Sequence, residues 1–323
     1  MAALPSHCNG LITYKESIVI ATFCIVASLL ATTGNVLVIA AIFRSIRLKT
    51  VSNFFLASLA VADLLVGAVI LPVITAKTLM REWLSTHSLV FAIEILALQA
   101  KVASTFNLSA VSIDRYIAVT RVFQYEDIMT RKKCFTVIAC VWIGSVFIAL
   151  LRLTVSDPVH IGIVWMVSEF VDFIIPLCII LFCYFHIFAI AHRQNRQINA
   201  ENTSTDRSRQ LAKSTKAAFT VGVVIGVFFM LLIASFITVM VQFTSDPCGQ
   251  VRMYKVWAWV GPIQLLNSAC NPLIYSIRSR EFRSAFRKLL LRQTGNSSEG
   301  TSFRDGSTAR IVKIKVQAAS TVS

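Results

Sequence analysis

Long uninterrupted apolar stretches dominate the pattern of hydrophobic and polar positions along the chain. Seven of them are long enough to cross the roughly 30 Å hydrocarbon core of a bilayer, which takes about 20 helical residues. They run approximately over residues 18–43, 51–76, 88–118, 134–151, 159–191, 217–243 and 256–277. None alternates like a barrel strand, and all are much longer than such a strand. The pattern therefore predicts an all-α fold, a bundle of seven transmembrane helices.

The polar segments divide the chain into four regions. Residues 1–17 are an N-tail and residues 18–277 the seven-helix domain. Around residues 278–291, apolar positions such as Phe282 and Phe286 recur among basic ones, a pattern typical of an amphipathic eighth helix at the membrane interface. Residues 292–323 are hydrophilic and are expected to form a disordered cytoplasmic tail.

The composition and charge narrow the classes of function. With 56% hydrophobic and only 15% charged residues, the chain is too apolar for a water-soluble enzyme or a nucleic-acid-binding domain. Lys and Arg in short loops stay on the cytoplasmic side. With the N-tail outside, 23 of the 31 basic residues fall in segments predicted to be cytoplasmic, where they attract anionic membrane lipids. We therefore expect a multi-pass plasma-membrane protein with an extracellular N-terminus and no nucleic-acid partner.

Short motifs or single landmark residues mark each predicted span. They are, in chain order, Gly34-Asn35-Val36-Leu37-Val38, Leu59-Ala60-Val61-Ala62-Asp63, Asp114-Arg115-Tyr116, Trp142, Pro176 with Tyr184, Phe228, and Asn267-Ser268-Ala269-Cys270-Asn271-Pro272-Leu273-Ile274-Tyr275. Through this ordered set the chain resembles a rhodopsin-like (class A) G protein-coupled receptor. The resemblance implies a receptor, not an enzyme, that takes an extracellular ligand and activates a heterotrimeric G protein. Arrestin and receptor kinases are the further partners it implies.

The resemblance also implies an activation switch at the cytoplasmic side. An acid beside Arg115 holds its guanidinium until a rearrangement frees it for a G protein, and Pro272 permits a bend in the seventh span. Tyr275 is expected to swing toward the third and fifth spans. The switch residues implied are Asp114, Arg115, Tyr116, Tyr184, Asn271, Pro272 and Tyr275.

A buried acid suggests an allosteric ion site. Asp63 lies near the middle of a span, where a charge costs about 2.5–3.5 kcal/mol on insertion scales and needs partners. By resemblance it belongs to a sodium site formed by Asn35, Asp63, Ser104, Asn267, Ser268 and Asn271. Their oxygens suit a hard cation. The alternative is a water-filled polar network without a specific ion.

Charged residues within the third and fifth spans indicate a ligand pocket. Glu94 and Lys101 are seven residues apart, about two turns along one helix face, with Ala97 between them where amine receptors carry an acid. Glu169 and Asp172 share a face of the fifth span. The candidate pocket residues are Glu94, Ala97, Lys101, Glu169, Asp172 and Leu232.

The charge of this set allows two interpretations. Three acids and one base leave a local charge of −2, which favours a cationic small molecule or peptide as ligand, or a divalent ion beside a peptide. Alternatively, Lys101 pairs with Asp172 or Glu169 and the pair only fixes helix packing.

Several positions depart from the family pattern. The sixth span reads Leu231-Leu232-Ile233-Ala234 where the family usually carries Cys-Trp-x-Pro, and Ser214 stands where many relatives place an acid that clamps Arg115. A silent, constitutively active or scavenging receptor, or a heterodimer partner, therefore stays an alternative; a transporter is disfavoured because internal repeats are not evident.

The cysteines on the outer side depart from the family as well. Val90 replaces the usual cysteine of the third span, so the customary loop disulfide cannot form. Cys8 and Cys248 face the oxidising side and are the candidate disulfide, with unpaired thiols as the alternative. The short cysteine-free second outer loop is similar to that of melanocortin receptors, whereas the first, second and seventh spans read more like those of biogenic amine receptors, so the branch stays open.

Overall fold

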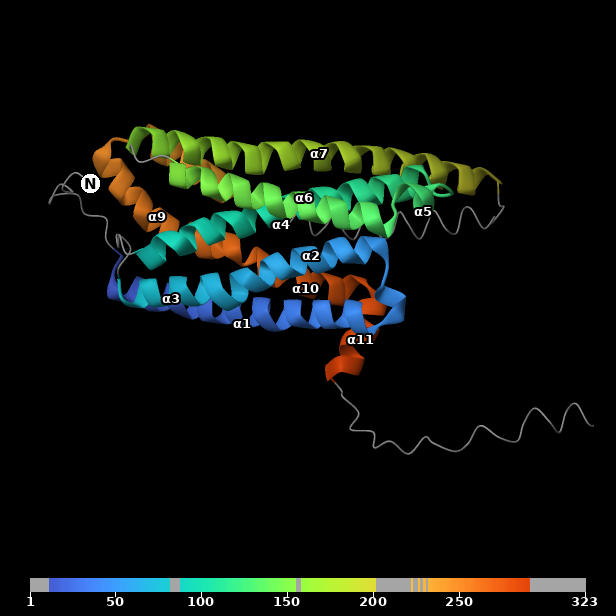
Figure 1. Ribbon diagram of the computed structural model, residues 1–323, viewed down its shortest axis with the longest axis horizontal. Coiled ribbons are helices and arrows are strands. Elements are labelled where there is room, and N and C mark those ends of the chain that lie inside the picture. Colours follow the sequence, from blue (N-terminus) through green and yellow to red (C-terminus); the bar gives the residue numbers. More distant parts are fainter. Residues whose placement is uncertain are drawn as a thin grey trace, which may run out of the picture. The chain divides into compact units, whose positions relative to one another are not determined.

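The computed structural model describes residues 12–81, 88–154, 158–201 and 232–290, together with Gly222, Gly226, Phe229 and Met230. The elements in the first half are α1 (Tyr14–Arg44), η1 (Ile46–Leu48), α2 (Val51–Leu65), η2 (Val66–Ile70), α3 (Leu71–Leu79), α4 (Ser88–Thr120), α5 (Tyr125–Ile128), α6 (Arg131–Leu150) and η3 (Leu151–Thr154). The second half contains α7 (Pro158–Glu201), a helical segment over Leu232–Thr244, α9 (Pro247–Leu265), α10 (Asn267–Arg278) and α11 (Arg280–Leu290). Figure 1 shows their arrangement.

The described helices reproduce the predicted spans. Five are long and apolar enough to cross a membrane: Tyr14–Arg44, Val51–Leu79, Ser88–Thr120, Arg131–Leu150 and Gly162–Ile190. Much of the sixth predicted span lies outside the described residues, and Leu232–Thr244 is its described apolar part. The seventh is divided into α9 and α10 at Leu266.

Helix ends differ from the predicted span ends where polar residues extend a helix. α1 begins at Tyr14 and not at residue 18, because Thr13 and Glu16 form a capping box: the Glu16 amide donates to Thr13 Oγ1 (3.3 Å) and the Thr13 amide to Glu16 Oε2 (2.8 Å). α7 continues to Glu201, ten residues past the predicted end at residue 191. A search for apolar residues cannot detect such polar helical turns.

The second span contains a change of helical register that the apolar pattern did not predict. A π-helical turn, η2, joins α2 to α3 just before Pro72, which has no amide hydrogen to donate. The Ser28 hydroxyl donates to the carbonyl of Gly67 at 2.7 Å. A Cβ at Gly67 would lie 2.8 Å from the Thr32 backbone nitrogen, so α1 approaches this turn as closely as only glycine allows.

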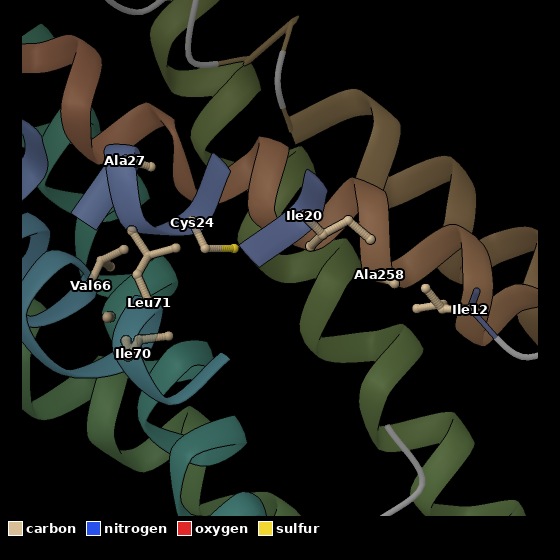
Figure 2. Packing of buried hydrophobic residues seen from close by; sticks show 9 residues of the cluster. Ile12, Ile20, Cys24, Ala27, Val66, Ile70, Leu71 and Ala258 are labelled. Carbon is tan, nitrogen blue, oxygen red and sulfur yellow. The ribbon is translucent and has the colours of Figure 1, made fainter. Parts of the chain in front are cut away.

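Helix α4 occupies a central place in the packing: it contacts α2, α6 and α7, while α1 contacts α2, α3 and α10 (Figure 1). One apolar cluster joins α1, η2, α3, α4 and α9. Figure 2 shows its members, which are Ile12, Ile20, Cys24, Ala27, Val66, Ile70, Leu71, Ala100 and Ala258. α6, in contrast, leaves large apolar side chains such as Ile143 and Phe147 exposed, as expected of a helix whose surroundings are lipid. These contacts position the polar groups described next.

Candidate functional site

The buried carboxylate of Asp63 is the centre of a polar cluster in the middle of the bundle. Asp63 is 2% exposed. Its Oδ1 accepts a hydrogen bond from the Ser268 hydroxyl (2.8 Å), and its Oδ2 accepts one from Asn271 Nδ2 (2.7 Å). Ser104 on α4 also interacts with this carboxylate. The structure thus joins α2, α4 and α10 at the acid that the sequence singled out.

Asn35 completes the cluster from α1, but through the backbone of α10. Its Nδ2 donates to the Ser268 carbonyl at 2.9 Å. That carbonyl lies four residues before Pro272, which has no amide hydrogen to offer it, so Asn35 replaces the missing helical donor. A Cβ at Gly34 would lie 2.8 Å from the Cβ and Cγ of Pro272, and the absence of a side chain at Gly34 therefore permits this close approach.

Two oxygens of this cluster have capacity for a cation. Asn35 Oδ1 and Asn271 Oδ1 are buried without a hydrogen-bond partner in the described part of the chain. Together with the Asp63 carboxylate they form an oxygen donor set of the type that hard cations prefer. Asn267 is also buried, but it makes no hydrogen bond with Asp63 in the described part of the chain. The residues present therefore fit a sodium ion chemically.

A second acid, Asp114, holds Arg115 at the end of α4. Arg115 donates to Asp114 Oδ2 through Nη2 (2.7 Å) and Nε (3.1 Å). The same Oδ2 accepts from the Ser52 hydroxyl (2.5 Å), and Oδ1 accepts from the Tyr125 hydroxyl (2.6 Å). Ser52 and Tyr125 are themselves 3.0 Å apart. We call Asp114, Arg115, Ser52 and Tyr125 the arginine latch.

Tyr125 keeps its proton at any physiological pH. It lies in α5, between two of the spanning helices. Burial, and then the negative charge of Asp114, raise the pKa of the Tyr125 phenol above its ordinary value. The phenol therefore remains a hydrogen-bond donor to Asp114.

The three tyrosines of the predicted switch, Tyr116, Tyr184 and Tyr275, are buried or packed against neighbouring helices. The hydroxyls of Tyr184 and Tyr275 are buried without a hydrogen-bond partner among the described residues. The Tyr275 ring stacks on Phe282 of α11, with ring centroids 5.7 Å apart. Tyr116 packs edge-on against His186 of α7 at 5.9 Å. Unsatisfied buried hydroxyls are uncommon, so these two have hydrogen-bonding capacity that the described residues do not use.

A third charged cluster joins α4 to α7 and consists of Lys101, Thr105, Glu169 and Asp172; we call it the α4–α7 charge cluster. Lys101 Nζ contacts Glu169 Oε1 and lies 3.3 Å from Asp172 Oδ2. The Thr105 hydroxyl donates to Asp172 Oδ1. The structure thus places Lys101 against both acids, where the sequence had left open which of them it contacts.

The remaining pocket candidates make other contacts. Glu94 pairs with Lys77 of α3, at 3.5 Å between Oε1 and Nζ, and its side chain is 41% exposed. Ala97 packs against the apolar cluster of α1, η2, α3 and α9. Leu232 is buried. Lys77 was not among the residues predicted for the pocket, and with its charge included the described charges around the candidate pocket sum to −1 and not to −2.

Some predicted residues cannot be placed. Cys248 is disulfide-bonded, while Cys24, Cys134, Cys140, Cys178, Cys183 and Cys270 are free. Cys8 lies outside the described residues, as do Ser214 and Phe228, so the Cys8–Cys248 pair stays a prediction. No group of three or more His, Cys, Asp or Glu residues capable of holding a metal ion occurs in the parts of the chain that are described.

Sequence reasoning missed four residues that hold these clusters together: Ser52, Lys77, Thr105 and Tyr125. Thr105 had a usable signal, because it lies one turn after Lys101 on the same face of α4. Ser52 and Tyr125 had none, since they come from other segments and meet Asp114 only in the folded bundle.

The chain is similar in sequence to known receptors. A family model described as "7 transmembrane receptor (rhodopsin family)" matches residues 34–275. The chain is 31% identical to the histamine H2 receptor of Cavia porcellus, over 93% of this chain and 87% of that receptor. It is 29% identical to the adenosine receptor A2a of Homo sapiens (86% and 74% covered) and 26% identical to the alpha-1D adrenergic receptor of Sus scrofa (90% and 59% covered).

The chain therefore belongs to the rhodopsin family of seven-transmembrane receptors. It is a multi-pass membrane protein and a G protein-coupled receptor for an extracellular ligand, not an enzyme. The predicted seven-helix, all-α fold class is confirmed.

Proposed function

We propose that this receptor lies in the plasma membrane with its N-terminus outside the cell and responds to a cationic small molecule or peptide. The distribution of basic residues along the sequence supports the orientation, because 23 of the 31 Lys and Arg residues fall in segments predicted to be cytoplasmic. The acids of α4 and α7 support the ligand class, because the described charges around the pocket sum to −1. The name of one relative, the histamine H2 receptor, is consistent with a cationic amine as the ligand.

The arginine latch carries the proposed mechanism. In the described arrangement Asp114 binds the Arg115 guanidinium and is itself held by Ser52 of α2 and Tyr125 of α5. Opening the latch frees Arg115 for the G protein. A ligand opens it only if it binds the open arrangement more tightly than the closed one, because binding shifts an equilibrium by no more than this difference in affinity.

Sodium at Asp63 is the proposed negative regulator. The ion would bind the Asp63 carboxylate with help from Asn35 Oδ1, Asn271 Oδ1 and the Ser104 hydroxyl, supplying positive charge to a buried acid. Because these groups come from α1, α2, α4 and α10, an ion bound to them favours the arrangement in which the four helices are close together. Sodium would therefore oppose activation.

Arrestin, receptor kinases and membrane lipids are proposed partners of the C-terminal part. Residues 292–323 contain several Ser and Thr side chains that phosphorylation would make strongly anionic. α11 carries buried Phe282 and Phe286 on one face and exposed basic residues such as Arg283 and Arg287 elsewhere. Such a helix suits an interface with anionic lipid.

A second candidate is a silent, constitutively active or scavenging receptor, or a heterodimer partner. The observation that favours it is the sixth span, where Leu232 and Ala234 stand at the positions of the family's tryptophan and proline. The helix from Leu232 to Thr244 has no proline to bend it. In this reading the ligand signal is not passed to the arginine latch.

Nucleotide exchange separates the two functions. Membranes from cells expressing the full chain are mixed with each class of purified heterotrimeric G protein and a panel of cationic compounds, and GTP-analogue binding is measured. We expect ligand-dependent exchange that disappears in Arg115→Ala at equal surface expression. Exchange that is high without ligand and lost in Arg115→Ala would favour the constitutive form. No exchange with any G protein, in the wild type and in the variant alike, would favour the silent or scavenging form.

A further inference from the structure

The α4–α7 charge cluster holds one more acid than base. Lys101 supplies one positive charge, and Glu169 and Asp172 supply two negative ones. The side chains of Glu169 and Asp172 are 4% and 2% exposed, and that of Lys101 is 11% exposed. Leu98 and Val102, which lie on α4 close to Lys101 in the chain, are buried in an apolar cluster. An unbalanced carboxylate in such surroundings is costly unless a proton or a further cation neutralises it.

The two acids are not equivalent. Both oxygens of Asp172 are engaged, Oδ1 by the Thr105 hydroxyl and Oδ2 by Lys101. Glu169 uses Oε1 for Lys101, and no hydrogen bond from a described residue reaches its Oε2. Glu169 also lies three residues before Asp172, about 4.5 Å nearer the end at which α7 begins. With the orientation proposed above, this end faces the outside of the cell.

We propose that the Glu169 carboxylate on α7 binds the cationic group of the ligand. The ammonium of Lys101, which is tethered to α4, occupies this binding site until the ligand binds. When a monovalent cation binds Glu169, Lys101 keeps Asp172 and the cluster holds two acids and two cations. The ligand is thus a monocation whose charged end points to α7. Amine receptors carry the corresponding acid on the third span, where this chain has Ala97. The inference rests on the proposed function, because the proposed membrane orientation is what makes this site accessible from outside the cell.

Propylammonium is the probe that tests cation binding at Glu169, because it matches the Lys101 side chain from Cγ to Nζ. The thermal midpoint of the purified full-length receptor is measured against propylammonium chloride and against propan-1-ol, which has the same shape and no charge. Sodium chloride keeps the ionic strength constant as the probe is added. Only differences between variants are compared, because a change in sodium binding at Asp63 shifts the thermal midpoint of each variant equally. With four non-hydrogen atoms the probe is expected to bind in the roughly millimolar range.

Two substitutions make the expected result specific. Glu169→Gln should weaken propylammonium binding at least tenfold, whereas Glu281→Gln, at an exposed acid in the first turn of α11 and outside the candidate pocket, should leave it within twofold. Lys101→Ala should strengthen it at least tenfold, because the tethered ammonium is gone and a space of the probe's shape is left. Propan-1-ol should stabilise none of the variants.

Three results would overturn the inference. They are no saturable stabilisation of the wild type, an equal shift in the wild type and in Glu169→Gln, and no gain of affinity in Lys101→Ala. If Glu169→Gln does not fold, the Lys101→Ala arm alone decides, with Glu169→Asp as the variant that keeps the charge. The assay needs no G protein, so its failure is distinct from failure of receptor signalling, which is measured by nucleotide exchange.

Discussion

Replacing Tyr125 by phenylalanine removes one hydrogen bond of the arginine latch and keeps the aromatic ring. The Tyr125 hydroxyl donates to the Asp114 carboxylate at 2.6 Å. A hydrogen bond to a charged group contributes about 1.5–3 kcal/mol, and 1.4 kcal/mol corresponds to about a factor of ten in an equilibrium constant. Ser52 still donates to Asp114 at 2.5 Å and compensates in part. We therefore take the lower end and expect Tyr125→Phe to favour the open latch about tenfold.

The consequence is a rise in signalling without ligand. A minor active state is commonly populated at about 0.1–10%, so a resting active population of about 1% would increase to about 10%. The measurement is basal GTP-analogue binding by membranes with purified G protein, normalised to receptor at the cell surface. Tyr14→Phe is the matched control, because Tyr14 is 67% exposed at the start of α1 and makes no contact with the latch. Basal exchange of Tyr125→Phe within twofold of the wild type would refute the latch as the closed state.

Two further substitutions test the centre of the bundle. Asp63→Asn should make basal exchange insensitive to replacing sodium by choline, whereas in the wild type sodium should lower exchange; an equal sodium effect in both proteins would exclude Asp63 as the ion's ligand. Gly34→Ala should cost about 1–3 kcal/mol through overpacking, seen as a lower thermal midpoint, because its Cβ would lie 2.8 Å from Pro272. Gly144→Ala is the control, since nothing lies within 4 Å of its Cβ, and an equal effect at both glycines would contradict the close α1–α10 contact.

The positions of the helices could be predicted from the sequence because the bilayer imposes a local requirement. Each crossing needs about 20 apolar residues, and polar residues inside such a stretch are conspicuous. Asp63, Arg115, Lys101 and Glu169 could therefore be selected as candidate site residues. Helix ends made of polar residues, such as the last turns of α7, carry no such signal, and the capping of α1 depends on two short-range hydrogen bonds.

The partners of those residues could be predicted only in part. The resemblance placed Ser268 and Asn271 with Asp63, and an acid of the fifth span was expected beside Lys101, but the actual contacts were decided by the tertiary structure. Spacing along one helix tells which side chains share a face, but it does not give the distance to a side chain on another helix. Asp114 and Ser52 are 62 residues apart in the chain, yet they are joined by a hydrogen bond. The sequence therefore determined which groups are chemically able to act, whereas packing of the helices decided that Tyr125 holds Asp114, that Asn35 serves the carbonyl released by Pro272, and that Lys101 stands between two acids.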